Sequence, residues 1–253
     1  MTATSFGDRL ADSPVYKSFR DHRFFAAVDT AEFSKEQAEI LIEQWWHPLH
    51  YFPTFLARCV SVLPDIASKS AITAILNQET GGGHVDRAHE VIYTESMDKS
   101  GFSAAKVTGT DPYPQTAALV EGYRSASEQR ESALGFIFAT ETTDLLMVSS
   151  IGKAIQRTTG VTDNEWVDIH IMQEPDHVEE ANHALTADFT PEQEQAVLDA
   201  ADRMWQLWTE FFDRLAVEAG VDGASGAAGT AAAAGDSGSA GTSGPAGTAG
   251  TPA

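Results

Sequence analysis

Residues 168–185 read DIHIMQEPDHVEEANHAL, and this stretch carries the strongest indication of the fold. His170, Glu174 and His177 stand at positions i, i+4 and i+7 of the helix that the stretch predicts. At about 100° per residue, the three side chains fall within about 60° of one another on one helix face. Two imidazoles and a carboxylate on one face are suitable ligands for iron, manganese or zinc. The alternative is a solvated polar face, because the same stretch also carries Glu179, Glu180 and His183.

Pro175 lies inside this predicted helix. Proline removes a backbone donor and clashes with the carbonyl four residues earlier, which costs about 3 kcal/mol in a helix interior. We therefore expect the helix to kink or restart there. Two interpretations stay open: an ordinary proline kink, or a helix that becomes fully ordered only when a metal binds.

A second stretch, LNQETGGGHVDRAHEVIY at residues 76–93, places a glycine triplet between Glu79 and His89. His84 and Asp86 also lie here, and Asp86 is three residues before His89, a spacing that shares a helix face. Each glycine inside a helix costs about 1 kcal/mol relative to alanine. The triplet indicates either a close approach of the backbone with a functional purpose, or a plain helix–loop–helix junction with exposed polar residues.

A third stretch, ALGFIFATETTDLLMVSS at residues 133–150, is the most apolar helical segment, yet it contains Glu141 and Asp144. A carboxylate in such surroundings is costly to bury unless it is paired or bound to a metal. The alternative is that Glu141 faces water on a narrow polar stripe. Four-helix carboxylate proteins build two-metal sites from such carboxylates and histidines on facing helices.

The rest of the chain is predicted to be helical nearly throughout. Ser34 and Gln37 form a capping box ahead of a long apolar-periodic run, in which Pro48 and Pro53 are expected to cause a kink or a break. Further helices are expected at residues 65–80, 84–96, 114–126, 127–158, 162–185 and 191–219, and a loop at residues 98–113. Because no segment shows strand alternation, the sequence predicts an all-α bundle of about seven helices.

The composition changes at Gly220. From there to Ala253 the chain consists largely of Gly, Ala, Ser and Thr, and Phe212 is its last aromatic residue. Such a segment cannot bury enough apolar surface to offset about 1–2 kcal/mol of backbone entropy per residue. We therefore expect one domain at residues 1–219 and a disordered tail at residues 220–253.

The charge and cysteine content exclude several function classes. The net charge of −21 comes from 37 acidic and 16 basic residues, and such a surface repels nucleic acids and anionic membranes. Cys59 is the single cysteine, which rules out disulfides within the chain and cysteine-ligated iron–sulfur clusters. The sequence shows no signal pattern and no run of about 18 apolar residues, so we expect a soluble, cytoplasmic protein.

In order and spacing, the three stretches resemble the haem-oxygenase-like diiron oxidases and oxygenases over roughly residues 35–215. That family has a Glu, a glycine-rich turn and a His, then a Glu in an apolar helix, then a final His, Asp and His. The matching metal ligands in this chain are Glu79, His89, Glu141, His170, Glu174 and His177, with Glu174 in place of the usual Asp. The HYFP stretch at residues 50–53 is also similar to the family. Alternative ligands are Asp86, His84, His50 and Asp144.

Some members take a carboxylate from the first core helix. In that region this chain offers His47 and His50, and Glu43 lies earlier. The resemblance therefore leaves the contribution of the first core helix open.

The resemblance implies a haem-oxygenase-like fold that binds two Fe ions (Fe2+/Fe3+), with O2 as co-substrate and an external electron donor. No catalytic residue beyond the metal ligands is implied. Glu79 precedes His89 by ten residues, which is similar to the nitrogen-oxidising members. The first expectation is therefore N-oxygenation of a small amine or amino-acid-derived substrate, and the second is oxidative C–C cleavage of an amino or fatty acid. Many members are dimers, so we expect a homodimer.

Two other classes stay open. The same fold hosts metal-free enzymes acting on thiamin-like compounds or a quinone-cofactor precursor, and a thiaminase-like member needs a nucleophilic cysteine, whereas Cys59 lies in an apolar helix. The other class is a non-enzymatic helical protein, either a metal store or an interaction module that binds a partner. Its contact surface would be formed by Trp45, Trp46, Phe24 and Phe25.

Overall fold

The computed structural model describes residues 6–185 and 189–221 and is all-α, which confirms the predicted fold class. No strand occurs among these described residues, which form α1 (Phe6–Ala11), α2 (Pro14–Arg20), α3 (Arg23–Val28), α4 (Lys35–Val62), α5 (Ile66–Glu79), the 3-10 helix η1 (Val85–Arg87), α6 (His89–Lys99), α7 (Ala104–Gly109), α8 (Pro114–Ala126), α9 (Arg130–Thr159), α10 (Glu165–Ala184) and α11 (Pro191–Glu218). These are more than the expected seven or so, because the sequence pattern does not predict the short helices α1 to α3 and α7.

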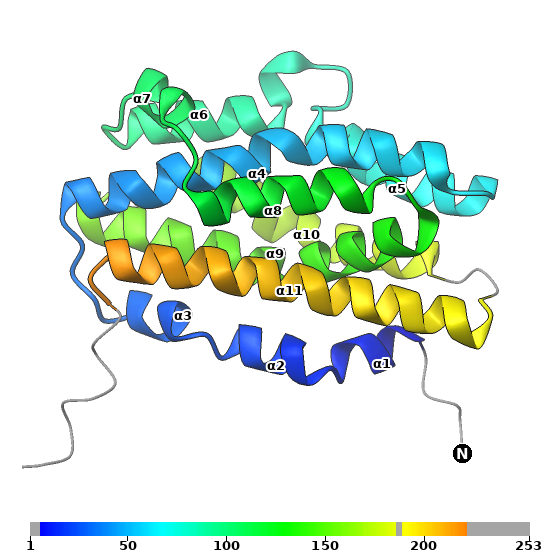
Figure 1. The fold of residues 1–253 in the computed structure, drawn as a ribbon. Coiled ribbons are helices and arrows are strands. Elements are labelled where there is room, and N and C mark those ends of the chain that lie inside the picture. Colours follow the sequence, from blue (N-terminus) through cyan, green and yellow to red (C-terminus); the bar gives the residue numbers. More distant parts are fainter. Residues whose placement is uncertain (1–5, 186–188, 222–253) are drawn as a thin grey trace, which may run out of the picture.

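The long helices lie side by side as a bundle (Figure 1). α9 packs against α11, α10 and α4, while α4 also contacts α5 and α8. The short helices α2 and α3 pack against α11 and α9 along the lower edge of Figure 1. Because α10 also contacts α5 and α6, the four helices α5, α6, α9 and α10 surround one interior region.

Local sequence signals set most of the helix ends. Capping boxes begin α4 at Ser34 and α11 at Thr190, where each side chain accepts a hydrogen bond from the backbone of the third helical residue. Pro114 stands in the first turn of α8, and Gly160 ends α9 with a left-handed φ of 74°. These boundaries agree with the sequence prediction because capping depends on neighbouring residues only.

At the prolines the structure excludes the expected break or restart, while the expected kink stays a prediction, and the expected loop at residues 98–113 is corrected. α4 does not break, although Pro48 and Pro53 lie inside it, and α10 likewise continues through Pro175 without a restart. Packing of α4 against α5, α8 and α9 compensates for the backbone bonds that proline removes. Within the expected loop at residues 98–113, α7 forms because Val107 is buried against the core.

The glycine triplet makes the turn between α5 and α6. Gly81, Gly82 and Gly83 have φ values of 80°, 62° and 91°, a left-handed conformation that other residues rarely adopt. A Cβ atom on Gly81 would lie 2.2 Å from the carbonyl oxygen of His84, so the backbone approaches itself closely here. α5 ends at Glu79 directly before this turn, and after η1 the next helix, α6, begins at His89.

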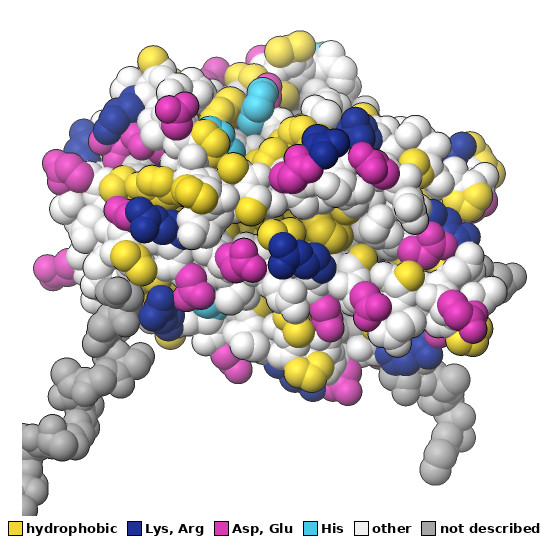
Figure 2. Space-filling model, viewed as in Figure 1, with side chains coloured by type: hydrophobic (Ala, Val, Ile, Leu, Met, Phe, Trp, Pro, Cys, Tyr) yellow, Lys and Arg dark blue, Asp and Glu magenta, His cyan; other side chains and the backbone are white. Residues whose placement is uncertain are grey.

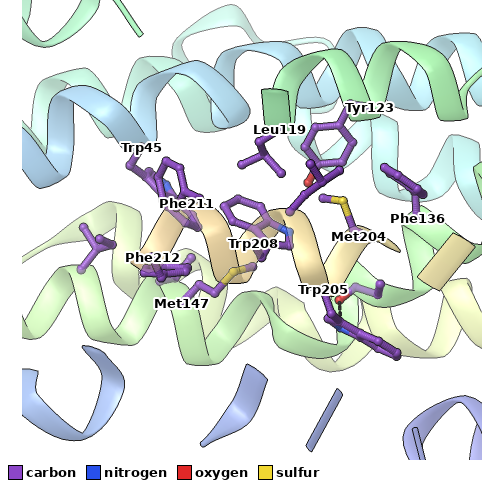
Figure 3. Packing of buried hydrophobic residues seen from close by; sticks show 14 of the residues in the cluster. Trp45, Leu119, Tyr123, Phe136, Met147, Met204, Trp205, Trp208, Phe211 and Phe212 are labelled. Atoms are coloured by element: carbon purple, nitrogen blue, oxygen red, sulfur yellow. Dashed lines mark hydrogen bonds between the residues drawn. The ribbon is translucent and has the colours of Figure 1, made fainter. Parts of the chain in front are cut away.

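The core is rich in aromatic rings that contact one another (Figure 3). Trp45 of α4 stacks on Trp208 of α11 at 5.4 Å between ring centroids, and Phe212 contacts both. Phe24 and Phe25 of α3 pack on Phe212 from the other side. Because Phe24, Phe25 and Trp45 are buried and Trp46 is partly buried against the core, these residues do not form the exposed surface that the interaction-module hypothesis requires.

α9 is long and apolar enough to cross a membrane by composition, yet 72% of its most apolar window is buried inside the bundle. Acidic and basic side chains are interspersed over the face seen in Figure 2. The predicted tail at residues 220–253 lies outside the described residues except for Gly220 and Val221.

Replacing Phe212 by alanine tests the aromatic core. Phe212 is fully buried, so we expect the Phe212→Ala variant to lose about 3–5 kcal/mol of unfolding free energy. Urea unfolding monitored by circular dichroism measures this loss. The control is Val217→Ala on the same helix, where the side chain is 47% exposed and the expected loss is within about 0.5 kcal/mol. Equal losses in the two variants would contradict the packing described here.

Candidate metal centre

Six side chains from four helices meet in the interior as two groups of three. Glu79 at the end of α5, His89 at the start of α6 and His170 of α10 offer ligand atoms within 4.8 Å of one another. The second group consists of Glu141 of α9 with Glu174 and His177 of α10, whose ligand atoms also lie within 4.8 Å of one another. The structure therefore brings together all six residues that the sequence analysis proposes as ligands.

Within the two groups, histidines lie next to carboxylates. His89 Nδ1 lies 3.0 Å from Glu79 Oε2, and His177 Nδ1 lies 3.3 Å from Glu141 Oε2. Asp144 of α9 extends the cluster, because its Oδ2 lies 3.9 Å from His170 Nε2. Oxygen and nitrogen atoms separated by about 3–4 Å can share one cation, since metal–ligand bonds measure about 2 Å.

Several polar atoms of the cluster are buried without a hydrogen-bond partner. They are His89 Nδ1, Glu141 Oε1, Asp144 Oδ2 and both carboxylate oxygens of Glu174. A buried polar group without a partner carries a desolvation penalty of about 1–3 kcal/mol, and more for a charged group. Carboxylates and imidazoles in this arrangement are suitable metal ligands, and the charge of a bound metal ion would compensate the buried acids.

The pKa values of Glu174 and Glu79 shift in opposite directions. Burial raises the pKa of Glu174, and Asp144 and Glu141 raise it further by repulsion. Burial also acts to raise the pKa of Glu79, but the attraction of His89 outweighs it and lowers the pKa to about 2. In the metal-free protein near neutral pH, Glu174 therefore carries a proton while Glu79 is ionised.

The histidines also differ from one another. Burial acts to lower the pKa of His177, but Glu141 outweighs it and raises the pKa to about 9. Burial, together with repulsion from His89, lowers the pKa of His170 to about 4. A metal ion that binds these two histidines at neutral pH must therefore displace a proton from His177 but not from His170.

Two glutamines that the sequence analysis did not single out contact the histidines. Gln78 Oε1 lies 2.6 Å from His177 Nε2, and Gln173 Oε1 lies 2.9 Å from His89 Nε2. The corresponding ring nitrogen of His170, Nδ1, lies 2.7 Å from the backbone oxygen of Trp166. In the sequence, the only available signal is that each glutamine immediately precedes a proposed ligand, Glu79 or Glu174.

Three of the four alternative ligands lie outside the cluster. His84 and Asp86 are exposed in and before η1. His50 is exposed and pairs with Glu90, with 2.7 Å between its Nδ1 and the carboxylate. Asp144 alone belongs to the cluster, because α9 presents it one helical turn after Glu141.

The first core helix, α4, places no carboxylate in either of the two groups. Glu43 is buried but pairs with Lys106, with 3.2 Å between Oε1 and Nζ. His47, which is partly buried, has its pKa lowered by desolvation and is likewise absent from both groups.

A cavity adjoins the metal centre. α4, α8 and α11 line it with the aromatic and aliphatic side chains Trp45, Pro48, Leu49, Phe52, Tyr123 and Trp208. The proposed ligands Glu79, Glu141, His170 and His177, together with Asp144, form its polar wall. An apolar cavity that converges on a few polar groups is the usual form of a small-molecule site.

Cys59 cannot serve as a nucleophile in this conformation. Its side chain is fully buried in α4, and burial raises the pKa of the thiol far above its ordinary value. A nucleophilic cysteine requires an accessible thiolate. The structure therefore does not support the thiaminase-like alternative.

Comparison with known families agrees with this geometry. Residues 39–209 match the sequence model of a family described as iron-containing redox enzymes. The chain belongs to this family. A search of curated proteins finds no match.

Solved structures with the same fold are distant in sequence. A CADD-like protein of unknown function from Nostoc punctiforme has a TM-score of 0.70 and 17% identity, covering 85% of this chain and 95% of its own. A domain of unknown function with a haem oxygenase-like fold from Shewanella denitrificans has a TM-score of 0.65 and 20% identity, with coverages of 89% and 93%. A TenA homologue from Pseudomonas syringae has a TM-score of 0.65 and 12% identity, with coverages of 84% and 93%. These similarities establish the haem-oxygenase-like fold.

Alanine substitution of the two α10 histidines separates the two groups. His170→Ala removes a ligand from the Glu79 group and His177→Ala removes one from the Glu141 group, so each variant should bind one metal ion fewer per chain. Anaerobic Fe(II) titration with metal analysis measures the stoichiometry. His183→Ala, an exposed position on the same helix, is the control and should bind as the parent does. Full stoichiometry in both site variants would contradict the assignment.

The pKa shifts predict that metal binding releases protons. Glu174 and His177 have raised pKa values and carry protons near pH 7, so a divalent ion must displace them. Affinity should therefore rise between about pH 6 and pH 8. Titration with Zn(II) in weak buffer containing a pH indicator measures the release, and the Glu174→Gln variant, which has no carboxyl proton to lose, should release fewer protons. A pH-independent affinity would show that the protons are not where we place them.

Proposed function

We propose that this protein is a non-haem diiron, O2-dependent oxidase or oxygenase that acts on a small metabolite. The observation that carries the proposal is the pair of buried ligand groups, one with Glu79 and one with Glu141, facing a single apolar cavity. Membership of an iron-containing redox family supports the choice of metal. Two adjacent groups of three ligands support two metal ions rather than one.

The protein residues hold the metals and shield the site. Glu79, His89 and His170 would hold one ion, and Glu141, Glu174 and His177 the other. When bound, two ferrous ions supply the electrons with which dioxygen is activated. Trp45, Phe52 and Trp208 cover the site with apolar surface and limit the access of water.

The first choice of reaction is N-oxygenation of a small amine. Among the described residues that line the cavity there is no lysine or arginine, and both lining histidines are assigned as metal ligands, so no free cationic side chain is available to pair with a carboxylate. Asp144, the lining carboxylate that belongs to neither ligand group, would instead attract a positively charged amine. This favours an amine, or an amino-acid derivative whose carboxylate is masked, over a free amino acid.

Asp144 is a suitable base for such a substrate. Oxygenation requires the lone pair of the nitrogen, so an ammonium substrate must first lose a proton. Asp144 lines the cavity, belongs to neither of the two ligand groups, and has an unpartnered, buried Oδ2 that could accept that proton. In the metal-free protein, burial raises its pKa to about 6, above the ordinary value of an aspartate, and this shift has the direction that a general base near neutral pH requires.

The second candidate is oxidative C–C cleavage of a fatty or amino acid. The indole N–H groups of Trp45 and Trp208 are buried without a hydrogen-bond partner, and both rings line the cavity. Such donors suit a carboxylate or carbonyl oxygen at the end of a hydrocarbon chain. The apolar side chains of Leu49 and Phe52 would pack against that chain.

Labelled dioxygen distinguishes these reactions. The protein is loaded anaerobically with Fe(II), mixed with a panel of small amines and fatty acids and a chemical reductant, and exposed to isotopically labelled O2. N-oxygenation consumes the amine, O2, two electrons and two protons, and yields a hydroxylamine that carries one labelled oxygen, with water as the other product. C–C cleavage yields a shortened product instead. Absence of iron uptake, or oxidation that persists undiminished in the His170→Ala/His177→Ala double variant, would refute the proposed function.

A further inference from the structure

The two proposed ligands Glu79 and Glu174 are each preceded by a glutamine in the sequence, and the two glutamines cross between the groups. Gln78 precedes Glu79 of one group, but its Oε1 lies 2.6 Å from Nε2 of His177 in the other. Gln173 precedes Glu174, and its Oε1 lies 2.9 Å from Nε2 of His89 in the opposite group. In each Gln–Glu pair, the glutamate therefore belongs to one group and the glutamine contacts a histidine of the other group.

We propose that Gln78 and Gln173 are positioning residues that hold His177 and His89 with Nδ1 facing the metal positions. The inference rests on the proposed metal-binding role of the cluster. In both histidines Nδ1 is the nitrogen next to a carboxylate, Glu141 or Glu79, while Nε2 is the nitrogen next to the glutamine oxygen.

The chemistry of the imidazole explains why an acceptor is needed there. A neutral imidazole that binds a metal through Nδ1 carries its proton on Nε2, and that N–H must donate to an acceptor when it is buried. The amide oxygen of glutamine accepts this bond and so selects both the tautomer and the ring orientation. Without it, the ring can rotate or place its lone pair on the wrong nitrogen.

The neutral charge of the amide also matters. The cluster already holds four carboxylates close together: Glu79, Glu141 and Glu174 are buried, and Asp144 is partly buried. A carboxylate acceptor behind each histidine would add further negative charge to this region, whereas an amide oxygen adds none. We therefore expect glutamine to favour the ferrous state more than glutamate would, because added negative charge stabilises the ferric ion.

His170 provides an internal comparison. Its Nδ1 lies 2.7 Å from the backbone oxygen of Trp166, four residues earlier on the same helix, and its Nε2 faces Asp144. Its orientation is thus set by α10 itself. His89 and His177 are instead held across helices, by α6–α10 and α5–α10 contacts, so their positions depend on correct docking of those helices.

Leucine substitutions test the two glutamines separately. Gln78→Leu and Gln173→Leu remove the acceptor while keeping a side chain of similar size. Each should weaken Co(II) affinity at one of the two metal positions by about 10–100-fold, the usual effect of losing such a partner. Asn77→Leu and Met172→Leu, at exposed neighbouring positions on the same helices, should leave both affinities unchanged. Isothermal titration of the full chain with Co(II) measures the affinities.

Two double variants assign each effect to a histidine, and two glutamate variants test the need for an acceptor. In a His89→Ala background Gln173→Leu should have no additional effect, and in a His177→Ala background the same holds for Gln78→Leu. Gln78→Glu and Gln173→Glu retain an acceptor and should restore affinity, while lowering the potential of the iron-loaded protein. In the Zn(II)-loaded protein, the nitrogen NMR shifts of labelled histidine should show metal on Nδ1 of His89 and His177.

The outcomes separate the inference from the proposed function. If the parent binds two ions and both leucine variants bind them equally well, or if Nε2 carries the metal in these two histidines, the positioning role is wrong while the oxidase proposal stands. If the positioning effects occur but no substrate is oxidised, the proposed function fails alone. A parent that binds no metal overturns both.

Discussion

The compensation of buried charge between carboxylates and imidazoles is the interaction on which the rest of this structure depends. Seven ionisable side chains meet in the interior, and among the described residues that line the adjoining cavity there is no lysine or arginine to balance the acids. Isolated buried carboxylates would be costly, so each must be protonated, paired with a histidine or bound to a metal. In the metal-free protein Glu174, whose pKa is raised, is protonated, and Glu79, whose pKa is lowered, is paired with His89.

The bundle supports this cluster by fixing four helices around it. Stacked aromatic rings of α4 and α11, including Trp45 and Trp208, supply apolar burial next to the polar site. The left-handed turn at residues 81–83 ends α5 and starts α6 so that Glu79 and His89 point into the same space. A rigid apolar frame of this kind also excludes water, which strengthens every electrostatic interaction inside it.

The chemical character of the site follows from the same constraint. Metal ions would relieve the repulsion between Asp144 and Glu174 and give partners to the unpaired carboxylate oxygens. The cavity then presents apolar walls on one side and acidic and imidazole groups on the other, which suits a small substrate with a reactive polar end. Glutamine rather than glutamate behind His89 and His177 keeps further negative charge away from this crowded region.

The sequence by itself determined the all-α class, most helix boundaries and the helix face that His170, Glu174 and His177 share. These depend on local rules: the caps at Ser34 and Thr190 act within one turn, and the face shared by His170, Glu174 and His177 follows from helical periodicity. That the three stretches form one site was predicted from the resemblance to a known family, because periodicity within a helix does not show which helices pack together.

Only the tertiary structure decided how the side chains combine. Packing of α5 against α10 brings Glu79 next to His170. Asp144 lies in the cluster, whereas His50, His84 and Asp86 lie outside it. Glu43 pairs with Lys106 and not with the cluster. The tertiary structure also showed that α4 continues through Pro48 and Pro53 and that Gln78 and Gln173 reach histidines 99 and 84 residues away in the chain. Such contacts join helices that are remote in sequence, so they depend on how the helices pack, and local sequence patterns carry no information about that packing.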